Sequence, residues 1–376
     1  MNKVFIIIYC IIISTSSCQS NKDKYKEVKT IHTSSSLKFE IDSTTNIWGD
    51  ADSIKKRCLT EVLHYKQTDY VAYLHDRDRK VDVFNLSNKQ LYTTSDFNME
   101  QEKYNEVNAL VLASPDSIFI IQFNRISLLY KNQIINQWLI NTDTNAINCI
   151  DNLENTSYSF DSKRNELFLT QYRCSSDFDN FDYFKSSPFQ LFSISTSTSR
   201  IPNITYSTKF FEDYYGFLNK AYVSSDIDNI YISYAIDPNI YIINKSTFKQ
   251  RCVGGRSSYQ KHNIKPLDNR FKDVSEVKIK HASISHKYME VYPDQFRKLY
   301  YRLYIDERPE KKNNGLYTTN KDNRQILMVF DSSFQLINEI VFEQNNKIKS
   351  KLLIKRDGVY FKSENGYKVI KTIQGN

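Results

Sequence analysis

The sequence predicts an all-β protein, a six-bladed β-propeller closed by an N-terminal strand that adds to the last blade. Short runs of aliphatic and aromatic residues, separated by polar turns, recur about every fifty residues, whereas long helical periodicity is nearly absent. The chain of 376 residues contains 27 Tyr and 23 Phe but only 8 Gly. Aromatic residues favour strands, and with so little Gly we expect Asn, Asp and Ser to build most turns.

The recurring element is an apolar strand, a polar turn and a second apolar strand, and most copies have a companion strand just upstream. The six copies begin at Val81, Ile126, Phe189, Ile240, Ile326 and Tyr367. The companion strands are expected at 70–74, 117–122, 166–171, 229–234 and 359–362. Three or four antiparallel strands at this spacing are typical of a propeller blade, which buries its faces by stacking on its neighbours. A pair of β-sandwiches is the alternative, and the even recurrence along the chain favours the propeller.

Closure of the ring is predicted from both ends of the body. The last copy ends near residue 373 without a further strand, while the alternating segment 37–42 has no partner. If this segment becomes the outer edge of the last blade, no apolar sheet edge is left exposed. We therefore expect one propeller domain over residues 37–376.

The N-terminus has the layout of an export signal. Lys3 is followed by an apolar run over 4–13 and by the small residues 14–17, as in a secretory signal peptide. The run is too short to span a bilayer comfortably. The small residues before Cys18 resemble the lipobox of bacterial lipoproteins, in which the Cys is diacylated and the signal is cut before it. Thr15 departs from that family, which usually has an aliphatic residue there, and an ordinary cleaved signal is the alternative.

These features predict a signal peptide over 1–17 and a polar tether over 18–36. The residue after Cys18 is Gln19 and not Asp. By resemblance to lipoprotein sorting rules, this favours an outer-membrane lipoprotein that faces the periplasm or the cell surface.

The lipobox, the tether and six degenerate blades together resemble the six-bladed propeller lipoproteins of Bacteroidota, which are similar in shape to TolB-like and NHL-type propellers. Many members of that group have no known function. The resemblance implies a fold and a location in the cell envelope, and it supplies no catalytic residue. The low Gly content departs from many propeller repeats.

Four further cysteines lie far apart along the chain, at Cys58, Cys149, Cys174 and Cys252. They contain no C-x-x-C pair, which argues against zinc-ribbon and thioredoxin-like sites. An exported protein can form disulfides, so three pairings remain open, as do free thiols.

Uneven spacing predicts insertions near 175–188 and 251–323, and propeller function commonly lies in such loops. The first is acidic and aromatic, and we expect a solvated loop. The second contains the only Gly-Gly and concentrates Arg, Lys and Tyr, which suit an anionic or sugar-like ligand. The candidate ligand-binding residues are Arg256, Tyr259, Lys261, His262, Arg297, Tyr300, Arg302 and Tyr304. For the stretch 297–304, an ordinary blade strand is the alternative.

No catalytic signature is present: the chain contains neither H-E-x-x-H nor G-x-S-x-G, and we expect no metal and no cofactor. The formal charge of +8 is modest for a chain of this size, and without a clustered basic face it does not indicate nucleic-acid binding. We expect a lipid-anchored binding or scaffold module for a protein, peptide or glycan, and not an enzyme. The alternative is a lactonase-like hydrolase with an axial metal site, which needs Glu, Asp or Asn side chains converging on the channel.

Overall fold

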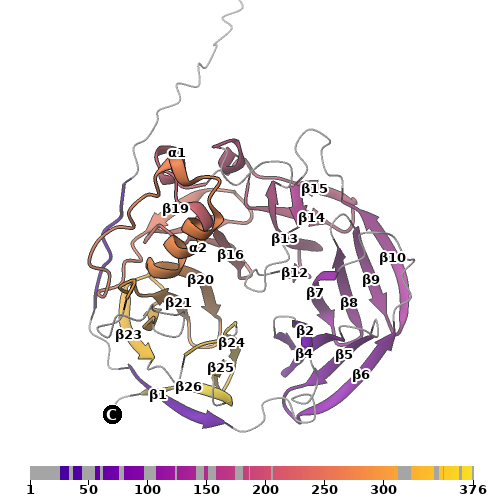
Figure 1. Cartoon of the computed structure of the whole chain (residues 1–376). Coiled ribbons are helices and arrows are strands. Elements are labelled where there is room, and N and C mark those ends of the chain that lie inside the picture. The colour runs from indigo at the N-terminus through magenta and orange to yellow at the C-terminus, as the bar shows by residue number, and fades with distance from the viewer. Residues whose placement is uncertain are drawn as a thin grey trace, which may run out of the picture.

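The chain forms a ring of six antiparallel sheets, each of them one blade of a β-propeller (Figure 1). The expected all-β, six-bladed architecture is therefore confirmed. The structure, a computed structural model, describes residues 26–33, 37–44, 56–59, 62–75, 80–96, 107–122, 125–140, 148–150, 158–173, 181–185, 187–204, 206–311, 323–342, 347–349, 351–363 and 366–374.

The strands of each blade follow one another along the chain, and only the sixth blade takes a strand from elsewhere. The first blade contains β2 (Lys56–Leu59), β3 (Leu63–Tyr65), β4 (Thr68–His75), β5 (Lys80–Asn85) and β6 (Gln90–Asp96). The second contains β7 (Val107–Ser114), β8 (Ser117–Gln122), β9 (Arg125–Tyr130) and β10 (Gln133–Leu139). The third contains β11 (Asn148–Ile150), β12 (Ser159–Asp161), β13 (Glu166–Arg173), β14 (Phe189–Ser193) and β15 (Thr198–Arg200).

The remaining blades have four strands each. The fourth contains β16 (Ala221–Ser225), β17 (Asn229–Tyr234), β18 (Ile240–Asn244) and β19 (Gln250–Val253). The fifth contains β20 (Lys287–Asp294), β21 (Leu299–Ile305), β22 (Gln325–Phe330) and β23 (Leu336–Phe342). The sixth contains β24 (Leu353–Lys355), β25 (Gly358–Ser363), β26 (Gly366–Gln374) and β1 (Leu37–Thr44).

The segment expected to join the last blade is β1, which pairs antiparallel with β26. The register runs from Leu37 opposite Gln374 to Thr44 opposite Tyr367, and the two strands lie side by side in Figure 1. The side chains of Leu37, Phe39 and Ile41 pack against the apolar core between the fifth and sixth blades. That this pairing holds the ring shut remains a prediction, tested below.

The blades are joined by packing at every interface of the ring. Six apolar clusters of buried residues lie one between each pair of neighbouring blades, including the first and the last. Successive residues of a strand pack against different neighbouring blades, because their side chains alternate between the two faces of the sheet. On β4, for example, Val71 packs toward the sixth blade and Ala72 toward the second.

Most tight turns are built by a side-chain oxygen at the end of a strand. Asn85, Asp161, Asn244 and Asp294 each accept hydrogen bonds from the second and third backbone N–H groups that follow. These are the expected Asn and Asp turns. The residues with left-handed backbone are not mainly the expected Asn, Asp and Ser. Four of the non-Gly residues with positive φ are lysines: Lys66, Lys89, Lys131 and Lys298.

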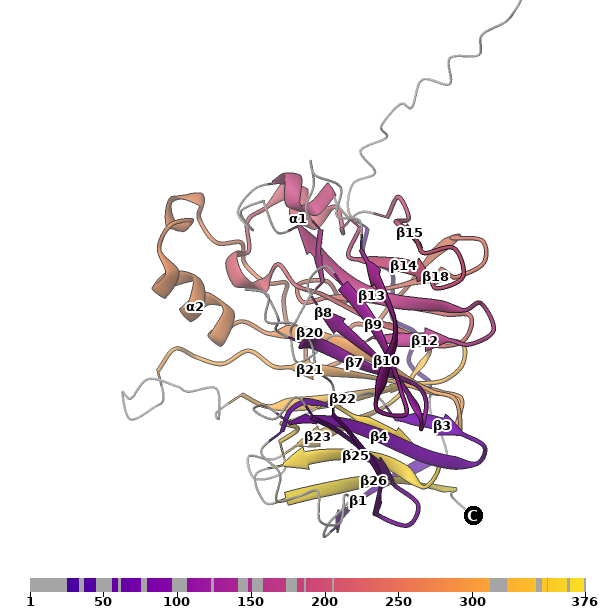
Figure 2. The same cartoon turned by 90° about the vertical axis from the view of Figure 1, so that its right-hand side faces the viewer.

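Antiparallel topology gives the ring two distinct faces. The turn face carries the short hairpins between the first and second strands of each blade and, in the first five blades, between the third and fourth. The insertion face carries the longer connections, and Figure 2 shows α1 and α2 away from the β3 hairpin. The helical segments of these connections are η2 (Phe181–Lys185), α1 (Lys209–Glu212), η3 (Gly216–Leu218), η4 (Asn269–Phe271) and α2 (Ser275–Ile284). Within the described residues, no helix is long and apolar enough to cross a membrane.

Both expected insertions need correction. The segment 251–323 is not one insertion, because it includes the first two strands of the fifth blade, β20 and β21. The segment 175–188 connects β13 to β14 within the third blade, and it is not wholly a solvated loop. Its Tyr183 and Phe184 are buried in an aromatic cluster with Tyr206 and Phe210.

The tether expected over 18–36 is too long, because residues 26–33 are docked on the propeller. This N-terminal strap runs along the fourth and fifth blades. The side-chain amide of Asn239 binds Lys26 O and Val28 N at 3.1 and 2.8 Å, and His32 forms a parallel bridge with Leu336. Gly254 admits the strap, because a Cβ there would lie 2.5 Å from backbone atoms of Lys29.

We predict that β1 stabilises the whole ring. Replacing Phe39 and Ile41 together by Ser should lower the free energy of unfolding by about 2–4 kcal/mol, because both side chains pack into an inter-blade core. The matched control replaces the outward-facing Lys38 and Glu40 by Ser and should change stability by only ~0.5 kcal/mol. Urea denaturation measures both, and equal stability of the two double variants would contradict the prediction.

Candidate functional site

The eight candidate binding residues do not form one site. Lys261 is exposed, and His262 pairs with Glu307 at 2.7 Å between Nε2 and Oε2. Arg256 pairs with Glu27 of the strap at 3.0 Å, and the Tyr259 ring lies under the Arg324 guanidinium at 4.7 Å. These residues lie on the insertion face.

Three of the candidates form an inter-blade contact of the fifth blade instead of a ligand site. Tyr300 stacks on Phe334 with ring centroids 4.2 Å apart, and Tyr304 is buried and donates to Asp306. Arg302 is 0% exposed, so its side chain is not accessible to a ligand. Its guanidinium donates to the carbonyl oxygens of Asp237, Pro238, Asn239 and Gly255 and lies 4.1 Å above the Tyr288 ring. The alternative, an ordinary blade strand, is therefore confirmed here.

Arg297 has a structural role on the turn face. Its Nε donates to Asp294 at 2.6 Å, and its side chain is 16% exposed against 0% for that of Asp294. Its two terminal nitrogens donate to the carbonyl oxygens of Lys355 and Arg356, both at 3.0 Å. Arg297 of the fifth blade therefore holds the β24–β25 turn of the sixth.

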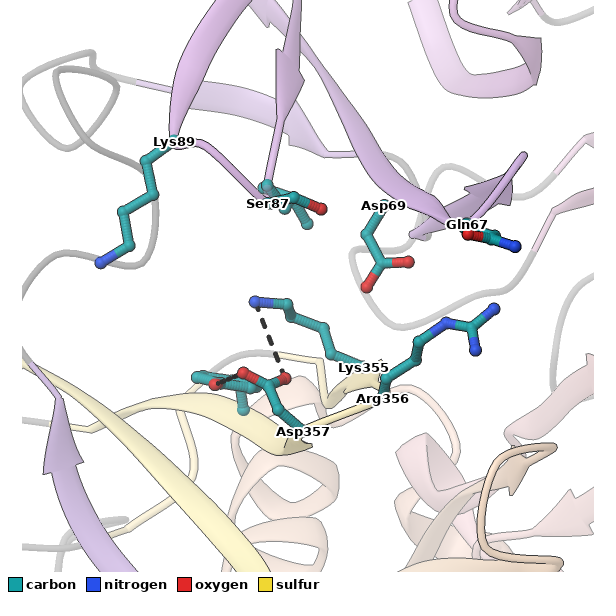
Figure 3. A pocket seen from close by; sticks show the side chains of 9 residues that line it. Gln67, Asp69, Ser87, Lys89, Lys355, Arg356 and Asp357 are labelled. Atoms are coloured by element: carbon teal, nitrogen blue, oxygen red, sulfur yellow. Dashed lines mark hydrogen bonds and ion pairs between the residues drawn. The ribbon is translucent and has the colours of Figure 1, made fainter.

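That turn forms one wall of a pocket between the first and sixth blades. The cavity has a volume of about 310 Å³, at the lower end of the range for small-ligand sites. Three cationic side chains line it, Lys89 on one wall and Lys355 and Arg356 on the other (Figure 3). The lining residues are Gln67, Asp69, Leu86, Ser87, Lys89, Lys355, Arg356, Asp357 and Tyr360.

The wall contributed by the first blade is built by two tight hairpins. Lys66 and Gln67 both have positive φ (45° and 68°), which matches the turn that joins β3 to β4 with the sheet's own twist. The β5–β6 turn begins at Asn85 and ends at Lys89, whose φ is 59°. This fixed geometry places the Lys89 side chain at the rim of the pocket, as Figure 3 shows.

The opposite wall contains a small polar network. Tyr360 OH donates to Asp357 at 2.6 Å, and Lys355 Nζ lies 3.9 Å from the same carboxylate and 4.6 Å from the Tyr360 ring centroid. Burial and the Asp357 charge raise the pKa of Tyr360, so the phenol remains a hydrogen-bond donor at neutral pH. Gly358 is required next to this turn, because a Cβ there would lie 2.5 Å from Val369 Cγ2.

Asp69 and Asp357 reduce the positive charge of the pocket, so the lining residues carry one net positive charge. His64 Nδ1 lies 2.6 Å from Asp69 Oδ1. Phe296 packs edge-on against His64 and lies beneath the Arg356 guanidinium, so one ring supports both walls. The arrangement can bind a carboxylate or phosphate group through Lys89, Lys355 and Arg356.

No residue of this pocket was predicted from the sequence. A signal was present for one wall, because Asp357-Gly358 is a dipeptide typical of hairpin turns, and Lys355-Arg356 precede it directly. The other wall lies almost 270 residues away, and no local pattern connects the two.

A second cluster of titratable groups surrounds His286 near the insertion face. His286 is 2% exposed, and its Nε2 has no hydrogen-bond partner among the described residues. Its ring lies near those of His262 and Tyr304. Burial, followed by the charge of His262, lowers the pKa of His286 to about 4.

The described residues offer few groups for metal binding or thiol chemistry. No group of three or more His, Cys, Asp or Glu side chains in that part of the chain could hold a metal ion. Cys252 is a free thiol whose pKa is raised to about 12 by burial. Cys58, Cys149 and Cys174 lie outside the residues whose side chains are described.

Comparisons with known proteins identify the fold. No protein-family model and no curated protein matches the chain. A member of the DUF4221 family from Bacteroides vulgatus is similar over 93% of this chain and 98% of its own, with 15% identity and a TM-score of 0.65. An exported protein of Bacteroides fragilis is similar over 94% and 99%, with 10% identity and a TM-score of 0.48. At such identity, the first of these similarities supports the fold alone.

We predict that His286 makes the protein less stable in acid. The folded protein holds this pKa near 4, below the 6.5 of an unfolded chain, so unfolding takes up a proton between these values. The free energy of unfolding should therefore fall by roughly 3 kcal/mol as the pH drops from about 6.5 to 4, at ~1.36 kcal/mol per pH unit. Lys209 and Arg256 oppose protonation of His286, whereas Asp306 favours it.

The measurement is urea denaturation across this pH range for the parent and for His286→Phe, which cannot titrate at this position. The difference between the two profiles isolates His286 from the carboxylates. Parallel profiles would show that His286 does not take up a proton on unfolding.

Proposed function

We propose that this protein is a lipid-anchored binding module of the cell envelope, which holds an anionic group of a peptide, protein or glycan in the pocket between its first and last blades. One observation carries the proposal: Lys89, Lys355 and Arg356, from turns far apart in the sequence, line one cavity of about 310 Å³. The fold supports a binding role, because propellers commonly present their sites on loops held by a rigid ring.

The rigid support of the pocket favours binding over a purely structural role. The Asp294 carboxylate is buried and orients Arg297, which in turn holds two backbone carbonyls of the cationic turn. A pocket held in advance loses little entropy when a ligand binds. Lys89 and Arg356 are exposed, so an incoming anion can reach them without displacing the core.

The lipid anchor is proposed from Cys18 and the residues before it. Two acyl chains on one Cys give stable membrane attachment, because each buried methylene contributes ~0.8 kcal/mol. The anchor would keep the propeller at the surface of a membrane.

Pocket binding is tested with the double variant Lys89→Ala, Arg356→Ala on an array of acidic and neutral peptides and glycans. We expect the parent to retain acidic members and the variant to lose at least about tenfold in affinity, since each charged contact contributes ~1.5–3 kcal/mol. The matched control is Lys131→Ala, Lys163→Ala, which removes two exposed charges from turns on the same face. If both double variants bind alike, or the parent retains no acidic member, the pocket is not the binding site.

The anchor is tested by Cys18→Ala. We expect this variant either to leave the membrane fraction as soluble protein or to remain as an unprocessed precursor with higher mass, because neither acylation nor the associated cleavage can take place. Fractionation and intact-mass measurement distinguish these outcomes. A Cys18→Ala protein in the same fraction and with the same processing as the parent would refute lipidation.

A further inference from the structure

The insertion face carries projecting segments with exposed apolar side chains, which have no role in the proposed pocket. We call the segments η3, η4 and α2, with the residues between η4 and α2, the insertion platform. No residue of α2 is buried, and α2 projects from the ring in Figure 2. Four apolar side chains of the platform are exposed: Phe217 (44%), Phe271 (37%), Val274 (41%) and Ile279 (58%).

Local contacts connect η3, η4 and α2. Lys278 Nζ lies 5.1 Å above the Phe217 ring, which joins α2 to η3. Val274 lies one turn before Lys278 and on the same side of the helix, and its N–H binds Phe271 O at 3.1 Å. Ile279 follows Lys278 directly and is the most exposed of the four apolar residues.

Cationic side chains outnumber carboxylates in this part of the chain. Residues 265–281 contain five lysines and arginines against three carboxylates. Two of the cations pair with acids, Arg270 with Asp268 and Lys280 with Glu310, both at 2.7 Å. Lys272 lies 5.5 Å above the Tyr214 ring. Apolar side chains together with a net positive charge match an anionic lipid surface, which attracts the cations and admits the apolar groups.

The path of the chain places a membrane near this face. The strap is held at Lys26 by Asn239, which lies in the β17–β18 connection on the insertion face and is 1% exposed. Eight residues separate Lys26 from the site of acylation at Cys18. Even a fully extended segment of that length spans at most about 28 Å. An acylated Cys18 therefore keeps this end of the strap close to the bilayer.

We propose that the insertion platform docks on an anionic lipid surface and turns the insertion face of the ring toward the membrane. This orientation rests on the lipid anchor proposed above. Docking of four apolar side chains and a small net charge is weak by itself, and the anchor makes it effective by raising the local concentration.

The test separates docking from acylation. A chain beginning at residue 19, which keeps every described strand and helix, carries an N-terminal hexahistidine tag and is held on vesicles by nickel-chelating lipid. The vesicles contain phosphatidylglycerol and brominated phosphatidylcholine, which quenches nearby tryptophan. Two variants are compared, Ile279→Trp on the platform and Ile135→Trp on the outer strand of the second blade, where the native side chain is similarly exposed at 55%.

We expect the added emission of Ile279→Trp to fall roughly twofold or more, because a docked side chain enters the outer ~5–10 Å of the bilayer. Emission of Ile135→Trp should stay unchanged. The emission of the parent gives the contribution of the native tryptophans and is subtracted from that of each variant. Quenching should weaken in 1 M salt, where the screening length falls to about 3 Å, and without phosphatidylglycerol.

Equal quenching of the two variants, or none in either, would overturn the proposal. The proposal would also be overturned if the tryptophan of Ile279→Trp became shielded from solvent only at protein concentrations that give dimers. The platform would then bind a second copy of the chain. Because the tag replaces the acyl anchor, these outcomes do not depend on whether Cys18 is lipidated. The Cys18→Ala experiment addresses that point separately.

Discussion

The architecture depends on reversing the chain many times with very few glycines. A propeller blade reverses direction after every strand, and tight reversals require either Gly or local hydrogen bonds that compensate the backbone. Here Asn or Asp at the strand end accepts two backbone N–H groups. The chain then returns through a left-handed residue four positions later, as in Asn85 to Lys89 and Asp294 to Lys298. The side-chain oxygen stabilises a turn whose left-handed residue need not be Gly.

The same turn chemistry produces the pocket. The turn that begins at Asn85 ends at Lys89, which lines the cavity. The turn that begins at Asp294 carries Arg297, whose guanidinium holds the backbone of Lys355 and Arg356. Asp294 therefore stabilises its own turn and orients the cation that supports a neighbouring blade. The cationic surface of the pocket follows from turns that the fold needs in any case.

The hairpins could be predicted from the sequence because their signals are local. Strands such as β18 and β22 read as short aliphatic runs bounded by Asn or Asp, and both lie where expected. Among the first strands of the blades, β16 (AYVSS) and β24 (LIK) were missed because they are short and weakly patterned. Because β20 was missed and the stretch that forms β21 was counted with the insertion, a connection and half a blade were taken for one long insertion.

Other features could not be predicted because they depend on contacts between distant segments. The strap reads as a polar linker, and its docking on Gly254 and Asn239 depends on contacts between segments far apart in the sequence. Arg302 among tyrosines has the composition of a ligand site. Its buried guanidinium is stabilised by hydrogen bonds to four carbonyl oxygens of the fourth blade, and no local sequence pattern indicates these contacts.

The two faces of the ring connect the proposals. The pocket lies on the turn face, since its residues come from the β3–β4, β5–β6 and β24–β25 turns. The platform and the start of the strap lie on the opposite face. A ring whose insertion face rests on the membrane therefore opens its pocket away from the lipid headgroups. This separation matters for charge, because anionic headgroups within about 8 Å would compete for Lys89 and Arg356 at physiological salt. Because the lipid-binding and ligand-binding cations lie on opposite faces of the ring, each set can bind its own anionic partner.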